Sequence, residues 1–170
     1  LITAGSAGQA EDARRWTVLV TRTEDNRNVG TAEAYAEFVS VDQDGTLVAV
    51  GDKDEVAVHQ LPDLKRLATV PRDGQDVATY DDPPQFVGEY LLTTAGARAD
   101  WWNPRTGEKV ASLDLTKHGI EPDVAGEVRI LPYPKGDRVA VVQPDSDEVV
   151  IVDRGGRTVG SLRVGSQPTW

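Results

Sequence analysis

Apolar residues recur along the chain in short runs, and each run ends at Gly, Asp, Asn or Pro. The clearest stretch holds four such runs, Ala36–Val41, Leu47–Val50, Glu55–His59 and Arg66–Val70. β-branched and apolar residues fill these runs, whereas turn formers such as Asp42-Gln43-Asp44-Gly45 separate them. This pattern predicts four antiparallel strands, named a, b, c and d in chain order.

The same order of strands returns along the rest of the chain. Strands a to d are expected at 85–87, 90–95, 98–102 and 109–115, and again at 128–131, 138–142, 148–152 and 158–164. The chain opens on strands b, c and d at 1–5, 16–21 and 28–31. Strand b of successive copies begins near Leu1, Leu47, Leu91 and Val139, so the spacings are 46, 44 and 48 residues. Helical periodicity is absent throughout.

A period of roughly 40–50 residues built from four strands is typical of β-propeller blades. The predicted fold is therefore an all-β propeller of about four blades, three complete and the first lacking its innermost strand a. The expected boundaries are 1–34 for the partial blade, then 35–83, 84–126 and 127–164, with 165–170 beginning a further innermost strand.

An open array of blades leaves an apolar face at each end, and propellers avoid this by closing a ring. Trp170 ends the last segment before it is long enough to complete the first blade. We therefore expect a sector of a larger ring, which a second chain or the remaining blades would complete. Methionine is absent, even at position 1, which indicates a processed product or a fragment.

Two of the repeats resemble known propeller families. Val139–Val142, Val149–Asp153 and Val164-Gly165-Ser166-Gln167-Pro168 resemble the YVTN type of repeat, and Trp101–Val110 resembles a WD repeat. The resemblance implies a ring-shaped platform. Members of the wider propeller family range from protein-binding scaffolds to lactonases, dehydrogenase subunits and peptidase-associated modules. No active-site motif of these members is matched in this chain, so the resemblance implies no catalytic residue.

The chain departs from the WD pattern at the end of strand c, where that family carries a Trp-Asp pair. The four copies read Thr21-Arg22, His59-Gln60, Trp102-Asn103 and Val152-Asp153. The Gly-His pair of the family is missing. A regular WD hydrogen-bond network is therefore not expected, and His59, which takes the place of the Trp, is interpreted as a packing residue.

Composition and charge disfavour several classes of partner. The 170 residues hold 28 acidic and 18 basic side chains and no cysteine, with a net charge of −10. An acidic chain repels phosphate backbones, which disfavours a nucleic-acid partner. No apolar run reaches the ~18 residues of a membrane helix, so membrane insertion is not expected. No motif for a catalytic site, a metal or another cofactor is present, and none of these is expected.

Loop length is the clearest functional signal. The long connections are 5–15, 71–84 and 116–127, which join strands b to c or d to a and therefore meet on one face of a propeller. Insertions that gather on one face favour a binding face. The candidate partner-binding residues there are Tyr80, Asp81, Asp82, His118, Glu121 and Asp123.

The leading interpretation is a non-catalytic propeller scaffold that binds a protein or peptide on this long-loop face. The alternative is an enzyme or an enzyme subunit, such as a lactonase-like hydrolase or a dehydrogenase subunit, with its site in blades outside this chain. A purely structural array is the third option. Asp42-Gln43-Asp44-Gly45 is interpreted as a β-turn rather than the start of a calcium loop.

Overall fold

A computed structural model describes residues 2–6, 15–22, 25–35, 38–51, 54–72, 83–95, 97–119, 129–133, 136–142 and 146–163. These residues form fifteen strands in four antiparallel sheets, and one short 3-10 helix. We call the sheets blades 1 to 4. Blade 1 contains β1 (Ile2–Ser6), β2 (Arg15–Arg22) and β3 (Arg27–Tyr35), and blade 2 contains β4 (Phe38–Val41), β5 (Leu47–Gly51), β6 (Glu55–Gln60) and β7 (Lys65–Pro71). Blade 3 contains β8 (Gln85–Val87), β9 (Tyr90–Ala95), β10 (Arg98–Trp102) and β11 (Lys109–Asp114), and blade 4 contains β12 (Arg129–Pro132), β13 (Arg138–Val142), β14 (Glu148–Asp153) and β15 (Thr158–Arg163).

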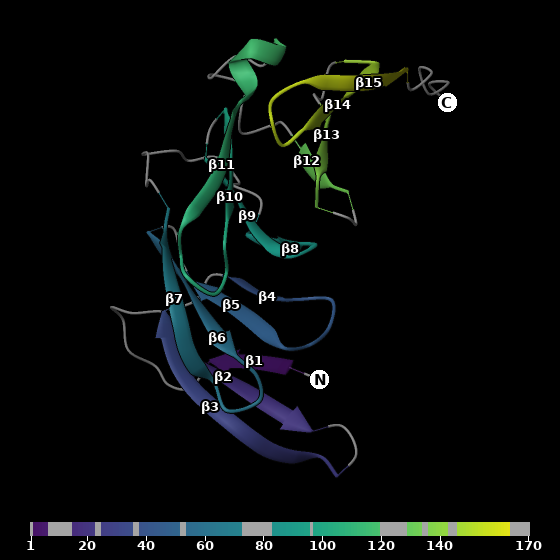
Figure 1. Cartoon of the computed structure of the whole chain (residues 1–170). Helices are drawn as coiled ribbons and strands as arrows, with labels where there is room; N and C mark the ends of the chain where they lie inside the picture. The colour runs from purple at the N-terminus through teal and green to yellow at the C-terminus, as the bar shows by residue number, and fades with distance from the viewer. Residues whose placement is uncertain are drawn as a thin grey trace, which may run out of the picture.

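The four blades follow one another along an open arc, with the chain ends at opposite ends of it (Figure 1). In every blade the strands are paired in chain order. Blade 1 has three strands and blades 2 to 4 have four, so the predicted partial propeller with an incomplete first blade is confirmed.

Strand positions agree closely with the sequence pattern, and two of the differences have a clear structural reason. β3 continues to Tyr35, four residues beyond the predicted end, because all eight residues of β2 find partners along it. The strand predicted to end at Leu115 stops at Asp114, because Leu115–His118 form a 3-10 helix, η1. The Asp114 carboxylate caps this helix by accepting from Thr116 N at 3.1 Å, and Gly119 ends it in the left-handed conformation (φ 81°).

The hairpin between strands c and d has the same construction in all four blades. A β-bulge places one extra residue in strand d, opposite Val20/Thr21, Val58/His59, Trp101/Trp102 and Ile151/Val152 of strand c. The turn between the two strands, which we call the c–d turn, holds a left-handed residue among its described positions, namely Asn26, Leu64, Gly107 or Gly156. A left-handed turn residue followed by a bulge bends and twists a hairpin. The four repeats therefore share backbone geometry as well as a strand pattern.

Each c–d turn after the first packs on the outer strand of the preceding blade. A Cβ added to Gly30 of β3 would lie 2.5 Å from the Pro62 carbonyl oxygen in the blade 2 turn. A Cβ added to Gly107 would lie 2.8 Å from the Thr69 oxygen of β7, and one on Gly156 would contact Leu113 of β11. The same joint thus connects blades 1 and 2, 2 and 3, and 3 and 4.

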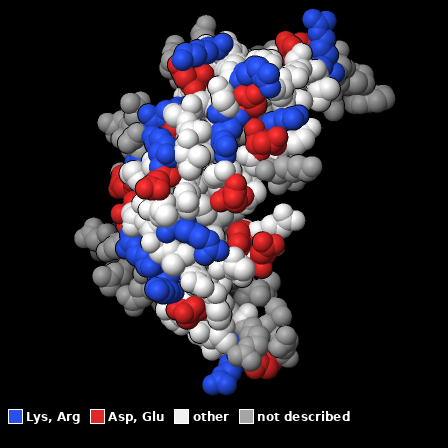
Figure 2. All heavy atoms as spheres, viewed as in Figure 1, with Lys and Arg blue, Asp and Glu red and all other residues white. Residues whose placement is uncertain are grey.

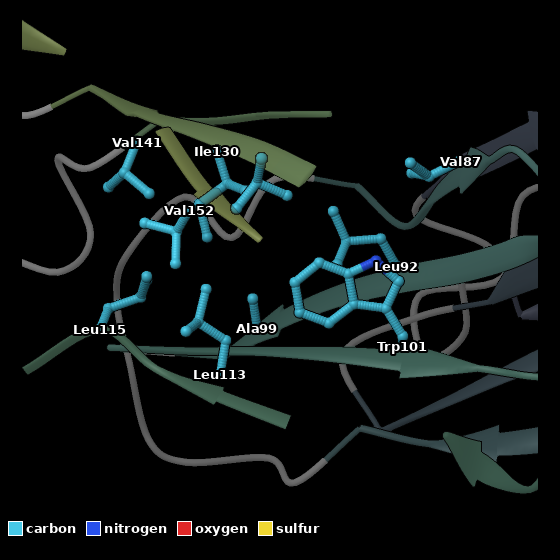
Figure 3. Close-up of a cluster of buried hydrophobic side chains, with 10 residues drawn as sticks. Val87, Leu92, Ala99, Trp101, Leu113, Leu115, Ile130, Val141 and Val152 are labelled. Atoms are coloured by element: carbon cyan, nitrogen blue, oxygen red, sulfur yellow. The ribbon is translucent and has the colours of Figure 1, made fainter. Parts of the chain in front are cut away.

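Apolar cores fill the three spaces between blades. Trp101 and Trp102, adjacent on β10, point to opposite sides of the sheet. Trp102 packs with Ala49 and Val58 of blade 2, and Trp101 belongs to the core shared with Val139 and Val152 of blade 4. Figure 3 shows the Trp101 ring directed from β10 toward the strands of blade 4. One sheet therefore contributes a large aromatic ring to each of its two interfaces, as adjacent strand positions predicted.

Candidate binding face

Two hollows lie side by side between neighbouring blades. The first, of about 450 Å³, lies between blades 2 and 3, and the second, of about 430 Å³, lies between blades 3 and 4. Both are lined by a–b turns and c–d turns. In an antiparallel sheet these turns lie at the end opposite to the b–c connections. The hollows therefore open on the short-turn face rather than on the long-loop face that the sequence favoured.

The rim of the first hollow contains the a–b turn of blade 2, whose shape depends on Asp42. Its carboxylate accepts hydrogen bonds from Thr46 N at 2.7 Å, Leu47 N at 2.8 Å and Thr46 Oγ1 at 2.7 Å. Gly45 adopts φ 68° and donates to the Asp42 carbonyl oxygen at 3.1 Å. Both carboxylate oxygens thus hold the turn, which agrees with the interpretation of this segment as a β-turn.

One side chain stiffens the c–d turn at the edge of each hollow, and the two side chains occupy equivalent positions in blades 3 and 4. Asn103 Oδ1 accepts from Arg105 N at 2.9 Å in blade 3. Asp153 Oδ1 accepts from Arg157 N at 2.9 Å in blade 4, and its other oxygen lies 3.1 Å from Arg157 Nε. The backbone N–H of Arg157 is the main reason that the pKa of Asp153 lies below its ordinary value. Asp153 is therefore ionised at neutral pH.

Glu89 and Tyr90 line both hollows and separate them. The guanidinium carbon of Arg154 lies 4.6 Å from the centre of the Tyr90 ring, which is a cation–π contact. This contact fixes the position of Arg154 in the second hollow while its N–H groups remain donors. Glu89 is an exposed carboxylate beside it.

The surface around the hollows carries charges of both signs. The first is lined by Asp42, Asp44, Glu89 and Arg105, and the second by Glu89, Asp137, Arg138, Asp153, Arg154 and Arg157. Figure 2 shows basic and acidic side chains interspersed along the arc rather than gathered into one patch. Such a surface suits polar and charged groups spaced along a polypeptide better than a uniformly charged polymer.

Of the residues that the sequence selected for binding, only His118 lies within the described part of the chain. It ends η1 and is half-buried, and its Nδ1 lies 3.2 Å from Thr158 Oγ1 at the start of β15. His118 therefore links blade 3 to the outer strand of blade 4. Tyr80, Asp81, Asp82, Glu121 and Asp123 lie outside the described residues, and their role stays a prediction.

The sequence did not identify Glu89, Tyr90 and Arg154 as candidates. Each lies in a short turn or at the first residue of a strand, where polar side chains are the norm. The repeat pattern was the only sequence feature that could have pointed to these residues, because it places equivalent turns of neighbouring blades next to each other. The pattern locates the turns, but it does not reveal that a hollow lies between them.

Among the described residues, no group of three or more His, Asp or Glu side chains is arranged to hold a metal ion. The same residues include no helix that is long and apolar enough to cross a bilayer. His59 is half-buried, and its Nδ1 lies 2.9 Å from the carbonyl oxygen of Leu64. It thus supports the c–d turn of blade 2, in line with its interpretation as a packing residue.

No family model and no curated protein matches the chain. Solved structures do match it. BamB from Moraxella catarrhalis gives a TM-score of 0.58 at 12% identity, covering 96% of this chain and 52% of that protein. Kluyveromyces lactis Hsv2 gives 0.60 at 11% identity, covering 94% and 51%, and the Cps50 (Swd1) beta-propeller domain of Myceliophteria thermophila gives 0.59 at 12% identity, covering 88% and 51%.

At these identities the similarity establishes the fold alone. The chain spans about half the length of the solved structures that it resembles. The repeat pattern, the four sheets and these matches agree, and the chain is a partial β-propeller.

Proposed function

We propose that this chain is a non-catalytic scaffold that binds an extended segment of a partner protein across its short-turn face. The observation that carries the proposal is the pair of adjacent hollows that share Glu89 and Tyr90. An extended peptide presents side chains at regular intervals, and two neighbouring hollows accept two of them. A propeller scaffold is well suited to this role because its rigid sheets fix the turns that form the surface.

The charges favour a segment that carries both signs. Arg154 is positioned by Tyr90 and donates to a carboxylate of the partner, whereas Glu89 accepts from a nearby Lys or Arg of the same segment. Aromatic and Arg side chains are enriched among the residues that dominate binding energy at interfaces. Tyr90 and Arg154 are therefore the central contacts of the proposal.

The test uses a displayed library of random twelve-residue peptides, selected on the immobilised 170-residue chain. Selected peptides are then measured by isothermal titration against Arg154→Ala and Glu89→Ala. Each substitution is expected to weaken binding about tenfold, equivalent to about 1.4 kcal/mol, because each removes one charge-assisted contact. Arg66→Ala is the matched control, since Arg66 pairs with Glu55 at 3.3 Å on blade 2 and lines neither hollow.

The same peptides distinguish the two faces. An Asp81→Ala/Asp82→Ala variant tests the long-loop face that the sequence favoured. Peptides that lose affinity for this variant while binding Arg154→Ala and Glu89→Ala normally would move the site to the long-loop face. A selection that enriches no peptide above background would contradict the scaffold function itself.

A further inference from the structure

The two hollows on the short-turn face differ in charge, and this difference bears on which segment they bind. We infer that the first hollow receives a Lys or Arg side chain of the bound segment, and that the second receives an Asp or Glu side chain three positions away in the same segment. This pairing rests on the proposed peptide-binding function and specifies the chemistry that the partner segment carries.

The first hollow carries an excess of negative charge. Its charged side chains are three carboxylates and one guanidinium, which leaves a net charge of −2, and they belong to Asp42, Asp44, Glu89 and Arg105. Asp42 uses both oxygens to hold its own turn. Asp44 and Glu89, which we call the rim carboxylates, are exposed, and no basic group of the described residues forms an ion pair with either of them. The hollow therefore favours a cationic side chain and disfavours an anionic one.

The wall of the first hollow is largely apolar. Leu47 and Pro104 are buried in it, and the half-buried Phe86 and Tyr90 also line it. Lys and Arg side chains bury their aliphatic stems against such surfaces while the charged group stays near water. A purely apolar side chain would instead cover the rim carboxylates without compensating their charge, which is costly. A Lys or Arg side chain therefore matches both the wall and the rim.

The second hollow offers one cation to an acidic side chain. Asp137 Oδ2 lies 3.3 Å from Arg138 Nε. Asp153 Oδ2 lies 3.1 Å from Arg157 Nε, so these four charges balance in two pairs. Arg154 is half-buried, its side chain contacts an aromatic ring, and no carboxylate of the described residues pairs with it. Arg154 is therefore the group in this hollow that is available to a carboxylate of the partner.

Two contacts hold Arg154 in place before a segment binds. Its backbone N–H donates to the Asp137 carbonyl oxygen at 3.0 Å, and its guanidinium carbon lies 4.6 Å from the centre of the Tyr90 ring. A donor that is already positioned loses little freedom on binding. Glu89 lines both hollows, so a cation bound in the first hollow also compensates the carboxylate that would otherwise repel an acidic side chain in the second.

The separation of the hollows sets the spacing of the two side chains. One blade lies between the hollows, and packed sheets are about 10 Å apart. In a polyproline II segment, side chains on the same side recur at every third residue, about 9 Å apart. In a β-strand, side chains on the same side lie about 7 Å or about 13 Å apart. The polyproline II spacing agrees best, which places the basic and acidic residues three positions apart.

The first measurement is the set of sequences that the immobilised chain selects from the random twelve-residue library. A basic and an acidic residue three positions apart are expected to be enriched over the unselected library. Selected peptides without this enrichment would overturn the pairing, although their binding would still support the scaffold function.

Double-mutant cycles then assign each side chain to a hollow. Asp44→Asn changes only the first hollow and keeps a residue that favours turns. It is expected to weaken a selected peptide about fivefold, and to have no effect on the same peptide with its basic residue replaced by Met. Asp63→Asn is the matched control, since Asp63 is also an exposed turn aspartate and lines neither hollow.

The reciprocal cycle uses Arg154→Gln, which changes only the second hollow. It is expected to weaken the selected peptide about tenfold, and to have no effect on the same peptide with its acidic residue replaced by Gln. In a third peptide the acidic residue is moved next to the basic one, and this change is expected to weaken binding to the wild-type chain to a similar extent.

The outcomes separate this pairing from the proposed function. If Asp44→Asn weakens both peptides equally or neither of them, the first hollow does not hold the basic side chain. If the loss in Arg154→Gln does not depend on the acidic residue, the second hollow does not hold that residue. Either result overturns the pairing while the peptides still bind, so the scaffold function stands. A chain that selects no peptide contradicts both.

Discussion

Asp100 is a carboxylate within the core between blades 2 and 3, and it is only 4% exposed. Its Oδ2 lies 2.9 Å from Lys109 Nζ and 3.2 Å from Arg98 Nε, and the Lys109 ammonium also lies 4.7 Å from the centre of the Trp102 ring. Burying a charge is costly unless it is paired, and here two cations supply the compensation.

Replacing Asp100 with Ala should therefore destabilise the chain by about 2 kcal/mol, because the half-buried Arg98 and the exposed Lys109 would both lose their counter-charge. The measurement is urea-induced unfolding followed by tryptophan fluorescence. Asp137→Ala is the control, since Asp137 pairs with Arg138 at 3.3 Å on the surface and such pairs contribute little. If the two substitutions reduced the free energy of unfolding equally, the ion pairs of Asp100 would contribute no more to stability than an exposed ion pair.

Asp153 leads to a pH prediction. Its folded pKa lies below the ordinary value of 3.8, chiefly because Arg157 N donates to it. A lowered folded pKa contributes stability above the unfolded pKa, and this contribution is lost as the pH falls through the folded pKa. The difference in melting temperature between wild type and Asp153→Asn should thus be full at pH 6 and shrink below about pH 4. A difference that stays constant down to pH 2 would rule out ionisation as its source.

Single residues were predictable where neighbours in sequence decide their role. The opposite orientations of Trp101 and Trp102 follow from strand alternation, and the role of Asp42 follows from its place in a turn. The Asp100 ion pairs and the contact between Arg154 and Tyr90 join different strands or blades. Their partners depend on register and on blade packing, which no local pattern specifies.

At the scale of elements, the c–d hairpin is the unit that both shapes a blade and attaches it to the preceding one. The left-handed position is occupied by Asn, Leu, Gly and Gly in blades 1 to 4. Leucine is unfavourable in this conformation, but the Leu64 side chain is buried against blade 1. The carbonyl oxygen of Leu64 also lies 2.9 Å from Nδ1 of His59. Packing thus compensates for local strain, which is why strands were predicted well from sequence but this turn geometry was not.

A pair of glycine substitutions separates backbone conformation from blade contact. Gly107 and Gly45 both have positive φ, but a Cβ on Gly107 would lie 2.8 Å from the Thr69 oxygen, whereas one on Gly45 would meet nothing within 4 Å. Gly45→Ala should cost about 1 kcal/mol for the left-handed conformation alone. Gly107→Ala should cost about 1–3 kcal/mol more, because the turn must move away from β7. Unfolding curves of the two variants make the comparison, and equal losses would contradict the proposed joint.

At the scale of the whole molecule, the blades differ in how many of their faces are covered. Blades 2 and 3 contribute to two cores each, whereas blade 4 contributes to one and leaves Leu131 and Leu162 exposed. The periodic strand pattern predicted this array and its incomplete ring. It did not predict the hollows, because loop length describes the long connections and says nothing of space between short turns.

A blade that is covered on both faces should be locally more stable than a blade that is covered on one face. In native-state hydrogen exchange, the amides of β9 and β10 should open only with global unfolding, whereas those of β15 should exchange by smaller openings. The wild-type chain is measured at two protein concentrations, so that any contribution from association is recognised. Equal protection of β10 and β15 would indicate that the four blades unfold as one unit.

The pairing of every strand with its neighbours in the chain has a consequence for how the molecule is made. Among the described strands no pairing waits for a distant segment, so each sheet forms by closing the loops between strands that are neighbours in the chain, which is the fast route to β-structure. During synthesis, blade 2 can complete its sheet while blade 3 is still being translated, and each new c–d turn then meets an outer strand that already exists. Assembly from the first blade to the last is therefore built into the order of the strands, and only the exposed face of the newest blade is at risk of misassociation at any moment.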